Sequence, residues 1–132
     1  MIGLDTNVLV RYLVKDEKKQ AARATAYIRK AIDEGEMCFI SSIVLCELVW
    51  VLESAYDYER KEIFSILEKI LLTKQLEVES QDMVRQAVHE YRQGSGDLAD
   101  YLIGRTNQAH GCGHTVTFDR ALKGSPHFVV LD

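Results

Sequence analysis

The sequence is poor in proline and cysteine, and it contains no long hydrophobic run. One proline and no low-complexity tract, together with 47% hydrophobic and 27% charged residues, exclude a disordered chain and predict a globular fold. The longest apolar stretch, residues 43–52, is interrupted by Glu47 and is too short to cross a bilayer. The composition therefore predicts a protein that does not associate with membranes.

The three cysteines, Cys38, Cys46 and Cys112, lie far apart and form no C-x-x-C pair. Their odd number and spacing predict reduced thiols rather than a disulfide framework or a zinc site. The N-terminus also lacks the basic start and apolar core of a secretory signal. We therefore expect a cytoplasmic protein with one domain over residues 1–132, long enough to bury a core without crosslinks.

Several common catalytic motifs are also absent. The four histidines do not show the H-E-x-x-H spacing of a zinc protease, and no G-x-S-x-G motif supports serine nucleophile chemistry. The segment Gly94-Ser95-Gly96 follows no predicted strand and lacks the rest of a phosphate-loop signature, so we interpret it as a flexible hinge. The net charge of -4 is unusual for a protein that binds nucleic acid.

Short apolar segments alternate with longer amphipathic segments along the whole chain. The short segments predict strands at residues 2–4, 37–40, 76–78, 114–118 and 128–131. The longer segments predict helices after residue 7, at 17–33, after a serine cap at 41 or 42, and at 59–73, 81–92 and 98–110. This alternation indicates an α/β fold with a central parallel sheet covered by helices on both faces, in three α/β/α layers.

Five carboxylates stand beside apolar sequence in four separate parts of the chain. They are Asp5, Glu47, Asp97, Asp100 and Asp119. A charge pushed toward a core is costly unless a cation or hydrogen-bond donors compensate it, and no single lysine or arginine serves all four places. A divalent ion that they share would compensate all of these charges. Oxygen-only ligands favour Mg²⁺ or Mn²⁺, which also bridge to phosphate.

The predicted fold brings these carboxylates toward one place. Asp5 and Asp119 each follow a strand, and open parallel sheets bind ligands beyond the carboxyl ends of their strands. Asp97 and Asp100 are three residues apart, so both can face the same site. Glu47 lies on a helix with many apolar neighbours, which leaves little solvent-facing surface for its charge.

Each carboxylate also has a purely structural explanation, which the sequence leaves open. Asp97 and Asp100 match a capping box, and Asp119 can cap the turn that follows it. Asp5 can accept hydrogen bonds from the amides of the next turn. Glu47 can belong to a buried ion pair.

Taken together, these segments resemble the PIN domain family and, within it, the VapC toxins of prokaryotic VapBC toxin–antitoxin pairs. The resemblance rests on four segments in family order: Asp5-Thr6-Asn7 after a short strand, Ser-Ser-Ile-Val-Leu-Cys-Glu47-Leu, Ala99-Asp100-Tyr-Leu-Ile-Gly, and Thr115-Val-Thr-Phe-Asp119. It covers essentially the whole chain.

The resemblance implies an endoribonuclease that depends on Mg²⁺ or Mn²⁺, with Asp5, Glu47 and Asp100 as the catalytic triad and Asp119 as a fourth member. It also implies metal coordination by Asp5, Asp100 and Asp119, with Asp97 as a helper. Auxiliary polar positions near the acidic pocket are Thr6, Asn7 and Thr117.

RNA is the expected substrate, and five basic side chains are candidates for holding its phosphates. They are Arg11, Lys15, Arg105, Arg120 and Lys123, and for any one of them a solvated surface charge is the default explanation. The toxin resemblance further implies a homodimer and a cognate antitoxin. Candidate anchors for such a partner are Trp50, Tyr56 and Tyr58, for which core packing is an equal explanation.

Two other classes fit parts of the sequence. A receiver-type signalling domain also binds Mg²⁺ through aspartates, but it needs a phosphoacceptor after a central strand and a lysine after a late one, and neither fits here. A catalytically inert PIN-like module would bind nucleic acid without cleaving it. Incubation with acetyl phosphate tests the first class, and a metal-dependent cleavage assay on structured RNA tests the second.

Overall fold

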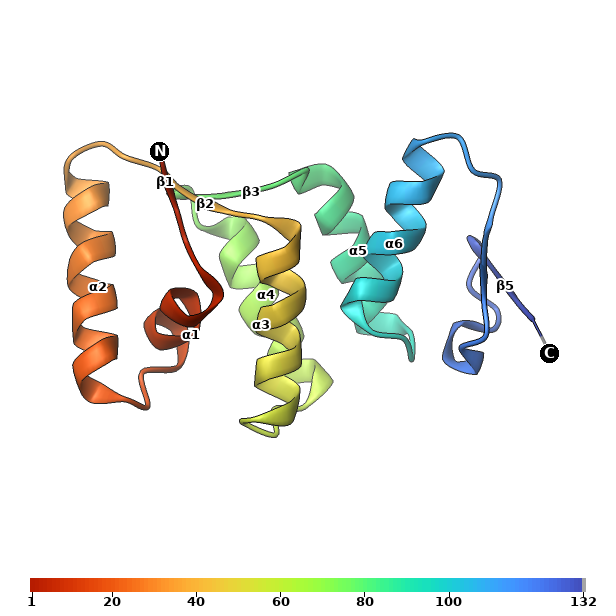
Figure 1. Cartoon of the computed structure of the whole chain (residues 1–132), viewed down its shortest axis with the longest axis horizontal. Coiled ribbons are helices and arrows are strands. Elements are labelled where there is room, and N and C mark those ends of the chain that lie inside the picture. The colour runs from red at the N-terminus through yellow and green to blue at the C-terminus, as the bar shows by residue number, and fades with distance from the viewer. Residues whose placement is uncertain (132) are drawn as a thin grey trace. The chain divides into compact units, whose positions relative to one another are not determined.

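The computed structural model describes residues 1–131, which fall into two units, Met1–Gln81 and a second unit that begins at Asp82 (Figure 1). The first unit contains β1 (Ile2–Gly3), α1 (Thr6–Val14), α2 (Lys18–Asp33), β2 (Cys38–Ile40), α3 (Ser42–Ser54), α4 (Arg60–Leu72) and β3 (Leu76–Val78). The second contains α5 (Gln81–Gln93, whose first residue closes the first unit), α6 (Leu98–Ala109), β4 (Thr115–Thr117), the 3-10 helix η1 (Arg120–Leu122) and β5 (Phe128–Val130).

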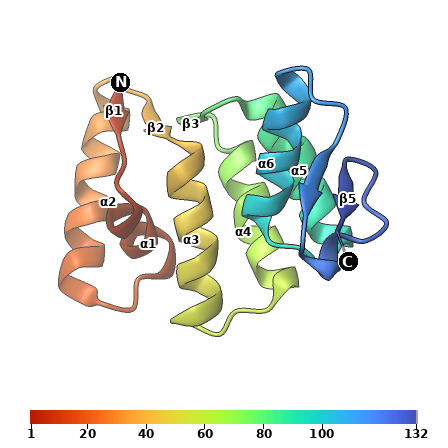
Figure 2. The ribbon, with the colours of Figure 1, turned by 45° about the vertical axis from the view of Figure 1, so that its right-hand side comes forward.

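The first unit is built on a parallel sheet in the order β1-β2-β3. Ile2 is in register with Cys38, and Cys38 is in register with Leu76. Cys38 and Ile40 lie on one face of β2 and are fully buried, whereas Phe39 on the opposite face is half-buried. Among the helices, α1 packs against α2 and α3, and α3 packs against α4 (Figures 1 and 2).

The helices begin and end where the sequence supplies caps. The Glu17 side chain accepts hydrogen bonds from the amides of Lys19 and Gln20 at the start of α2, and Ser41 accepts one from Val44 at the start of α3. Glu59 begins α4 with a capping box. These caps satisfy amides that the first helical turn leaves without partners.

The second unit packs α5 and α6 with a two-stranded parallel sheet. Thr115 is in register with Phe128, and Thr117 with Val130. Gly104 allows α6 to approach β5 closely, because a Cβ at this position would lie 2.8 Å from the Phe128 ring. Tyr91 and Leu98 are buried in the core of this unit.

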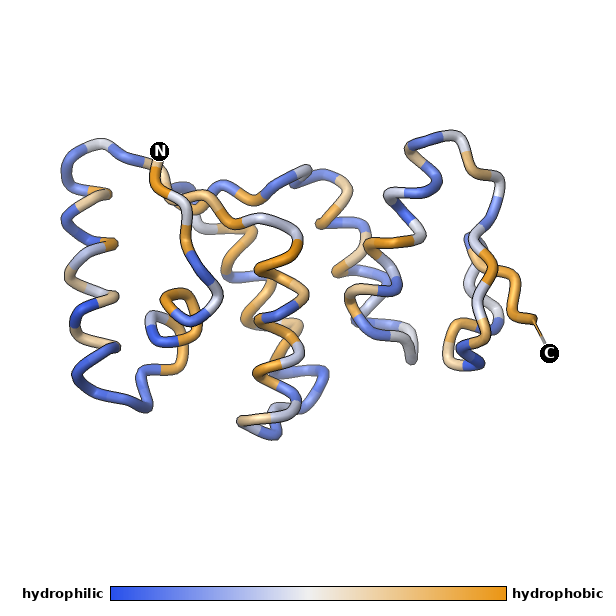
Figure 3. Tube along the Cα trace, viewed as in Figure 1, coloured by the Kyte–Doolittle hydropathy of each residue, from blue (hydrophilic) through white to orange (hydrophobic). Residues whose placement is uncertain are grey.

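The predicted α/β class is confirmed, since helices alternate with strands and every described strand pair is parallel. Polar and apolar positions alternate along the helices (Figure 3). Within residues 1–131, no helix combines the length and the apolar content that a membrane span requires. That residues 1–132 form one domain stays a prediction.

Candidate active-site carboxylates

Thr6 links two of the predicted site segments in the first unit. Its Oγ1 donates a hydrogen bond to Glu47 Oε1 over 2.8 Å, although 41 residues separate the two in sequence. Thr6 is 7% exposed at the start of α1, directly after Asp5, and α1 packs against the helix that carries Glu47. The structure therefore brings Glu47 to the Asp5-Thr6-Asn7 segment.

Asp5 occupies the N-cap position of α1 but does not cap it. Its backbone is extended, with φ -75° and ψ 155°, and its side chain accepts no hydrogen bond from the helix amides. The structural explanation for Asp5 is therefore wrong. Its side chain is exposed and has no internal partner among residues 1–131, so both oxygens are free for a ligand. Asn7 is also exposed and lines a pocket of about 570 Å³ between β1, α1 and α2.

Glu47 lies on an exposed face of α3, so the expectation that this helix has little solvent-facing surface was wrong. Its neighbours one turn away, Ile43 and Trp50, are 72% and 50% exposed. The opposite face buries Leu45, Leu48, Val49 and Leu52. Because α3 is apolar on both faces, hydropathy alone did not distinguish the core side. Glu47 also forms no ion pair with the described residues, so the buried ion pair is not observed.

In the second unit, Asp97 and Asp100 form the capping box that the sequence left open. The Asp97 amide donates to Asp100 Oδ2 over 3.0 Å, and the Asp97 side chain accepts from the amide of Asp100. This arrangement begins α6 and fixes both carboxyl groups at its first turn. The cap does not exclude a catalytic role, because each carboxylate has two oxygens.

The surroundings of Asp100 disfavour its charged form. Burial raises its pKa above the ordinary value, the hydrogen bond from the Asp97 amide lowers the pKa, and the charges of Asp97 and Asp119 raise it further. Asp119 therefore lies close enough to interact with the start of α6. The half-buried anion of Asp100 would be stabilised by any cation that these carboxylates share.

Asp119 ends the segment after β4 and begins η1. Its Oδ1 accepts a hydrogen bond from the amide of Ala121 over 2.9 Å, as the capping explanation predicted. Its own amide donates to Thr117 Oγ1 over 3.0 Å. Thr117 thus fixes the backbone that presents Asp119, which gives this predicted auxiliary residue a positioning role.

The interpretation of Gly94-Ser95-Gly96 as a flexible hinge was wrong. Tyr101 is 4% exposed, and its hydroxyl accepts a hydrogen bond from the amide of Gly96 over 3.0 Å. A Cβ at Gly94 would lie 2.0 Å from the same hydroxyl. The glycines are therefore required by the close approach of Tyr101, which holds the turn before Asp97. Sequence reasoning missed Tyr101, although its position next to Asp100 was a signal.

The donor chemistry suits a hard divalent cation. Within each unit taken separately, the described residues include no group of three or more His, Cys, Asp or Glu side chains placed to hold a metal ion. The first unit offers Asp5 and Glu47, and the second offers Asp97, Asp100 and Asp119. These are oxygen ligands only, and two of them, Asp5 without a partner and Asp100 among like charges, gain from a bound Mg²⁺ or Mn²⁺.

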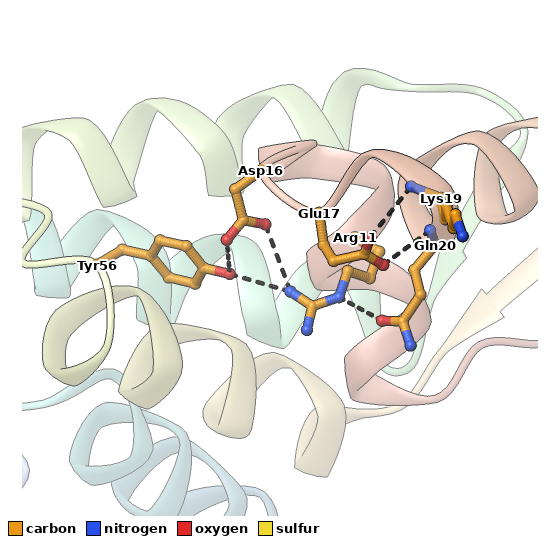
Figure 4. Close-up of polar contacts among 6 residues, drawn as sticks. All are labelled: Arg11, Asp16, Glu17, Lys19, Gln20 and Tyr56. Carbon is orange, nitrogen blue, oxygen red and sulfur yellow. Dashed lines mark hydrogen bonds and ion pairs between the residues drawn. The ribbon is translucent and has the colours of Figure 1, made fainter.

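Arg11, a predicted phosphate contact, is held in an internal network (Figure 4). Its Nε donates to Gln20 Oε1 over 2.6 Å, and its Nη1 donates to Tyr56 Oη over 3.1 Å and to Asp16 Oδ1 over 3.3 Å. Tyr56 Oη in turn donates to Asp16 Oδ2 over 2.9 Å, and this bond is the main reason that the pKa of Asp16 is lowered. The network joins α1 to α2 and to the segment after α3.

Arg105 is likewise occupied within the second unit. Its Nε donates to Glu90 Oε1 over 2.7 Å and its Nη1 to Gln86 Oε1 over 3.3 Å, so it joins α6 to α5. The Lys15 Nζ lies 5.8 Å from the centre of the Tyr12 ring, a cation–π contact.

Arg120 and Lys123 differ from the other predicted cations. Both are exposed, and neither forms an ion pair or a side-chain hydrogen bond with residues 1–131. They line a pocket of about 290 Å³ together with Gly124, Phe128 and Val130. Of the five candidate phosphate contacts, these two side chains are the most available to bind a phosphate.

Comparisons with known proteins match most of the chain. The family model described as PIN domain matches residues 2–124. A protein of Aquifex aeolicus (strain VF5), named VapC ribonuclease, is 31% identical over 120 residues, which cover 91% of this chain and 88% of that protein. The family-model match extends over both units, so it includes all five carboxylates described above.

Proposed function

Because this chain belongs to the PIN domain family, we propose that it is a metal-dependent endoribonuclease that hydrolyses phosphodiester bonds in RNA. The family match also confirms the three-layer α/β/α class that the sequence predicted. The likeness to a VapC ribonuclease supports a further proposal, that the chain is the toxin of a VapBC-type pair. Reduced cysteines are consistent with action in the cytoplasm, where its RNA substrate is found.

The observation that carries the proposal is the hydrogen bond from Thr6 to Glu47. It joins two of the four family-like segments, and it leaves Asp5 with an exposed carboxylate that no internal group satisfies. The free carboxylate of Asp5 supports a role toward an external cation and phosphate.

We propose that four of the carboxylates are the metal ligands of the nuclease. Asp5, Asp97, Asp100 and Asp119 would hold Mg²⁺ or Mn²⁺. When bound, such an ion activates a water for in-line attack and offsets charge on the leaving oxygen. Burial, together with the charges of Asp97 and Asp119, raises the pKa of Asp100, and this supports the assignment because a shared cation would stabilise the anion.

Glu47 is proposed as the general base that accepts the proton of the attacking water. Thr6 orients it, since the hydrogen bond engages one carboxylate oxygen and leaves the other for the water. In the second unit, Thr117 holds the Asp119 amide and thereby orients that carboxylate. Asn7 is proposed to position water or phosphate beside Asp5.

Amide variants of the carboxylates test the proposal. We expect Asp5→Asn, Asp100→Asn and Glu47→Gln each to lower Mn²⁺-dependent cleavage of a structured RNA by at least about 100-fold, in line with loss of a metal ligand or a general base. Single-turnover cleavage is the measurement. Glu68→Gln is the matched control, because Glu68 is exposed on α4 and has no partner among the described residues.

Undiminished cleavage by the Asp5 and Asp100 variants would end the assignment. Metal binding by the parent protein, detected by calorimetry, without cleavage of any RNA would instead favour an inert nucleic-acid-binding module. Thermal unfolding of each variant verifies that a loss of cleavage is not a loss of fold.

A cognate antitoxin and a second copy of the chain are the proposed protein partners. Of the three candidate anchors, Tyr56 is hydrogen bonded to Asp16, and its ring lies 6.0 Å from that of Tyr58. Trp50 is half exposed on the same face of α3 as Glu47. Trp50 is therefore the anchor most open to a partner, and burial of its indole on complex formation is measurable by fluorescence.

A further inference from the structure

Helix α2 is strongly basic in a chain that is acidic as a whole. Its cations are Lys18, Lys19, Arg23, Arg29 and Lys30, and its one acid is the last residue, Asp33. α2 therefore has a formal charge of +4, while the other 11 cations and 19 acids of the chain give the rest a charge of -8. The negative net charge thus does not exclude a basic surface.

The five cations lie on the side of α2 that faces away from the core of its own unit. The buried stripe of the helix has residues spaced three and four apart, namely Ala21, Ala24, Ile28 and Ala31. At about 100° per residue, all five cations fall on the opposite half of the helix, and each of them is exposed. These five cations are the basic face of α2, and between them lie only small exposed side chains, Ala22 and Ala26.

Folding alone does not explain the basic face. Lys18 and Lys19 stand in the first turn, where the positive end of the helix dipole disfavours cations. Lys19 and Arg23 are four residues apart, a spacing at which like charges repel. None of the five forms an ion pair with another of residues 1–131. Because burial of unpaired cations is costly, whatever covers this face must supply negative charge.

The basic face belongs to the same unit as Asp5 and Glu47, and a pocket lies between the two regions. Asn7, two residues after Asp5, lines the pocket of about 570 Å³ together with Arg23. Every residue that lines this pocket belongs to the first unit. With a rise of 1.5 Å per residue, Lys19 and Lys30 are about 16 Å apart along α2. The face is therefore long enough to contact several phosphates.

We infer that the basic face of α2 binds the phosphate backbone of the RNA substrate outside the cleavage site. This inference rests on the proposed nuclease function and adds a substrate-binding surface to it. A protein with a net charge of -4 repels a polyanion unless cations are gathered on one surface. Phosphate contacts carry no sequence information. The face therefore raises affinity for any RNA that reaches it, without selecting the sequence that is cleaved.

A triple variant, Arg23→Gln with Arg29→Gln and Lys30→Gln, tests the inference, since glutamine is also a good helix former. We expect KM for a long structured RNA to rise by at least about 10-fold while kcat stays constant. Binding of the same RNA is measured by fluorescence anisotropy in the Asp100→Asn background, which silences turnover. The slope of log affinity against log salt concentration should become shallower by about 2–3, because three phosphate contacts are lost.

The matched control is Lys61→Gln with Lys69→Gln and Lys74→Gln. It removes the same charge from exposed positions of the same unit. Its KM and its salt slope should equal those of the parent. A short oligoribonucleotide with the cleavage site and few flanking nucleotides is the control substrate, and its KM should be the same for the α2 variant and the parent. Thermal unfolding verifies that all variants are folded.

Equal affinity of the α2 variant and the parent for the long RNA would overturn the inference. An equal loss in the α2 and control variants would also overturn it, because net charge rather than this face would then hold the RNA. Loss of binding to an acidic partner protein with unchanged RNA binding would likewise assign the face to that partner.

Failure of the nuclease proposal is a separate result, namely the absence of metal-dependent cleavage by the parent protein. A parent that binds RNA through α2 without cleaving it retains the inference. An α2 variant that cleaves the long RNA with the KM of the parent removes the inference and leaves the nuclease proposal intact.

Discussion

Replacement of Gly94 by alanine tests whether the turn before Asp97 is packed or hinged. The added Cβ would lie 2.0 Å from Tyr101 Oη, 3.0 Å from Tyr101 Cζ and 3.1 Å from the carbonyl oxygen of Glu90. Tyr101 is 4% exposed, so packed atoms must shift to make room. Overpacking of this kind costs about 1–3 kcal/mol, which lowers the Tm of a chain of this size by roughly 3–15 °C.

A double-mutant cycle isolates the contact between a side chain at position 94 and the Tyr101 hydroxyl. Tyr101→Phe removes the hydroxyl that accepts the Gly96 amide, at a cost of about 0.5–1.5 kcal/mol. In the double variant the closest overlap is gone, while Tyr101 Cζ and the Glu90 carbonyl still crowd the new methyl. The double variant should therefore be about 1 kcal/mol more stable than the sum of the single changes predicts.

The assay is urea unfolding followed by far-UV circular dichroism. Gly113→Ala is the control, because no heavy atom lies within 4 Å of a Cβ at that position. Its effect should be neutral or stabilising by up to about 1 kcal/mol, since alanine reduces the entropy of the unfolded chain. If Gly94→Ala matches this control, or if the two single effects add, the packing argument is refuted and the hinge interpretation returns.

Three further outcomes are expected. Thr6→Val removes the donor to Glu47, so kcat should fall while KM stays constant, and an unchanged kcat would contradict the orienting role. Burial raises the pKa of Asp100 in the folded protein above the ordinary value of 3.8. The protonated carboxyl group therefore adds to the free energy of unfolding below about pH 3.8, and this contribution is lost as the pH rises through the raised pKa. In EDTA, Asp100→Asn should therefore have a higher Tm than the parent at about pH 7 but not at about pH 3, and the reverse order would contradict the pKa shift. Tyr56→Phe breaks two bonds of the Arg11 network and should cost about 1 kcal/mol in urea unfolding without weakening RNA binding, whereas weaker binding would return Arg11 to the phosphate contacts.

Helix positions were predicted well wherever local signals agreed with each other. The helices expected at 17–33, 59–73 and 98–110 are observed at Lys18–Asp33, Arg60–Leu72 and Leu98–Ala109. In each case an apolar stripe with helical spacing begins after an acidic cap and ends near a residue that stops a helix. Such signals act over a few residues, so the sequence contains them directly.

Features that depend on tertiary partners were not predictable in the same way. The exposed side of α3 was misjudged, because both of its faces are apolar and only the packing of α1 and α4 distinguishes them. The glycines before Asp97 were misread for the same reason, since the Tyr101 side chain that crowds them is a matter of packing. Arg11 was only a candidate phosphate contact, and its internal network was not foreseen because the three acceptors lie up to 45 residues away in sequence.

The capping box at the start of α6 limits which substitutions evolution can accept at Asp97 and Asp100. Asp97 and Asp100 would serve folding and chemistry with the same side chains, so a lineage that abandons cleavage is not free to discard them. Asparagine retains the acceptor that the helix needs, whereas alanine would fray its first turn. Descendants that have become inert are therefore expected to carry amides at these two positions more often than aliphatic residues.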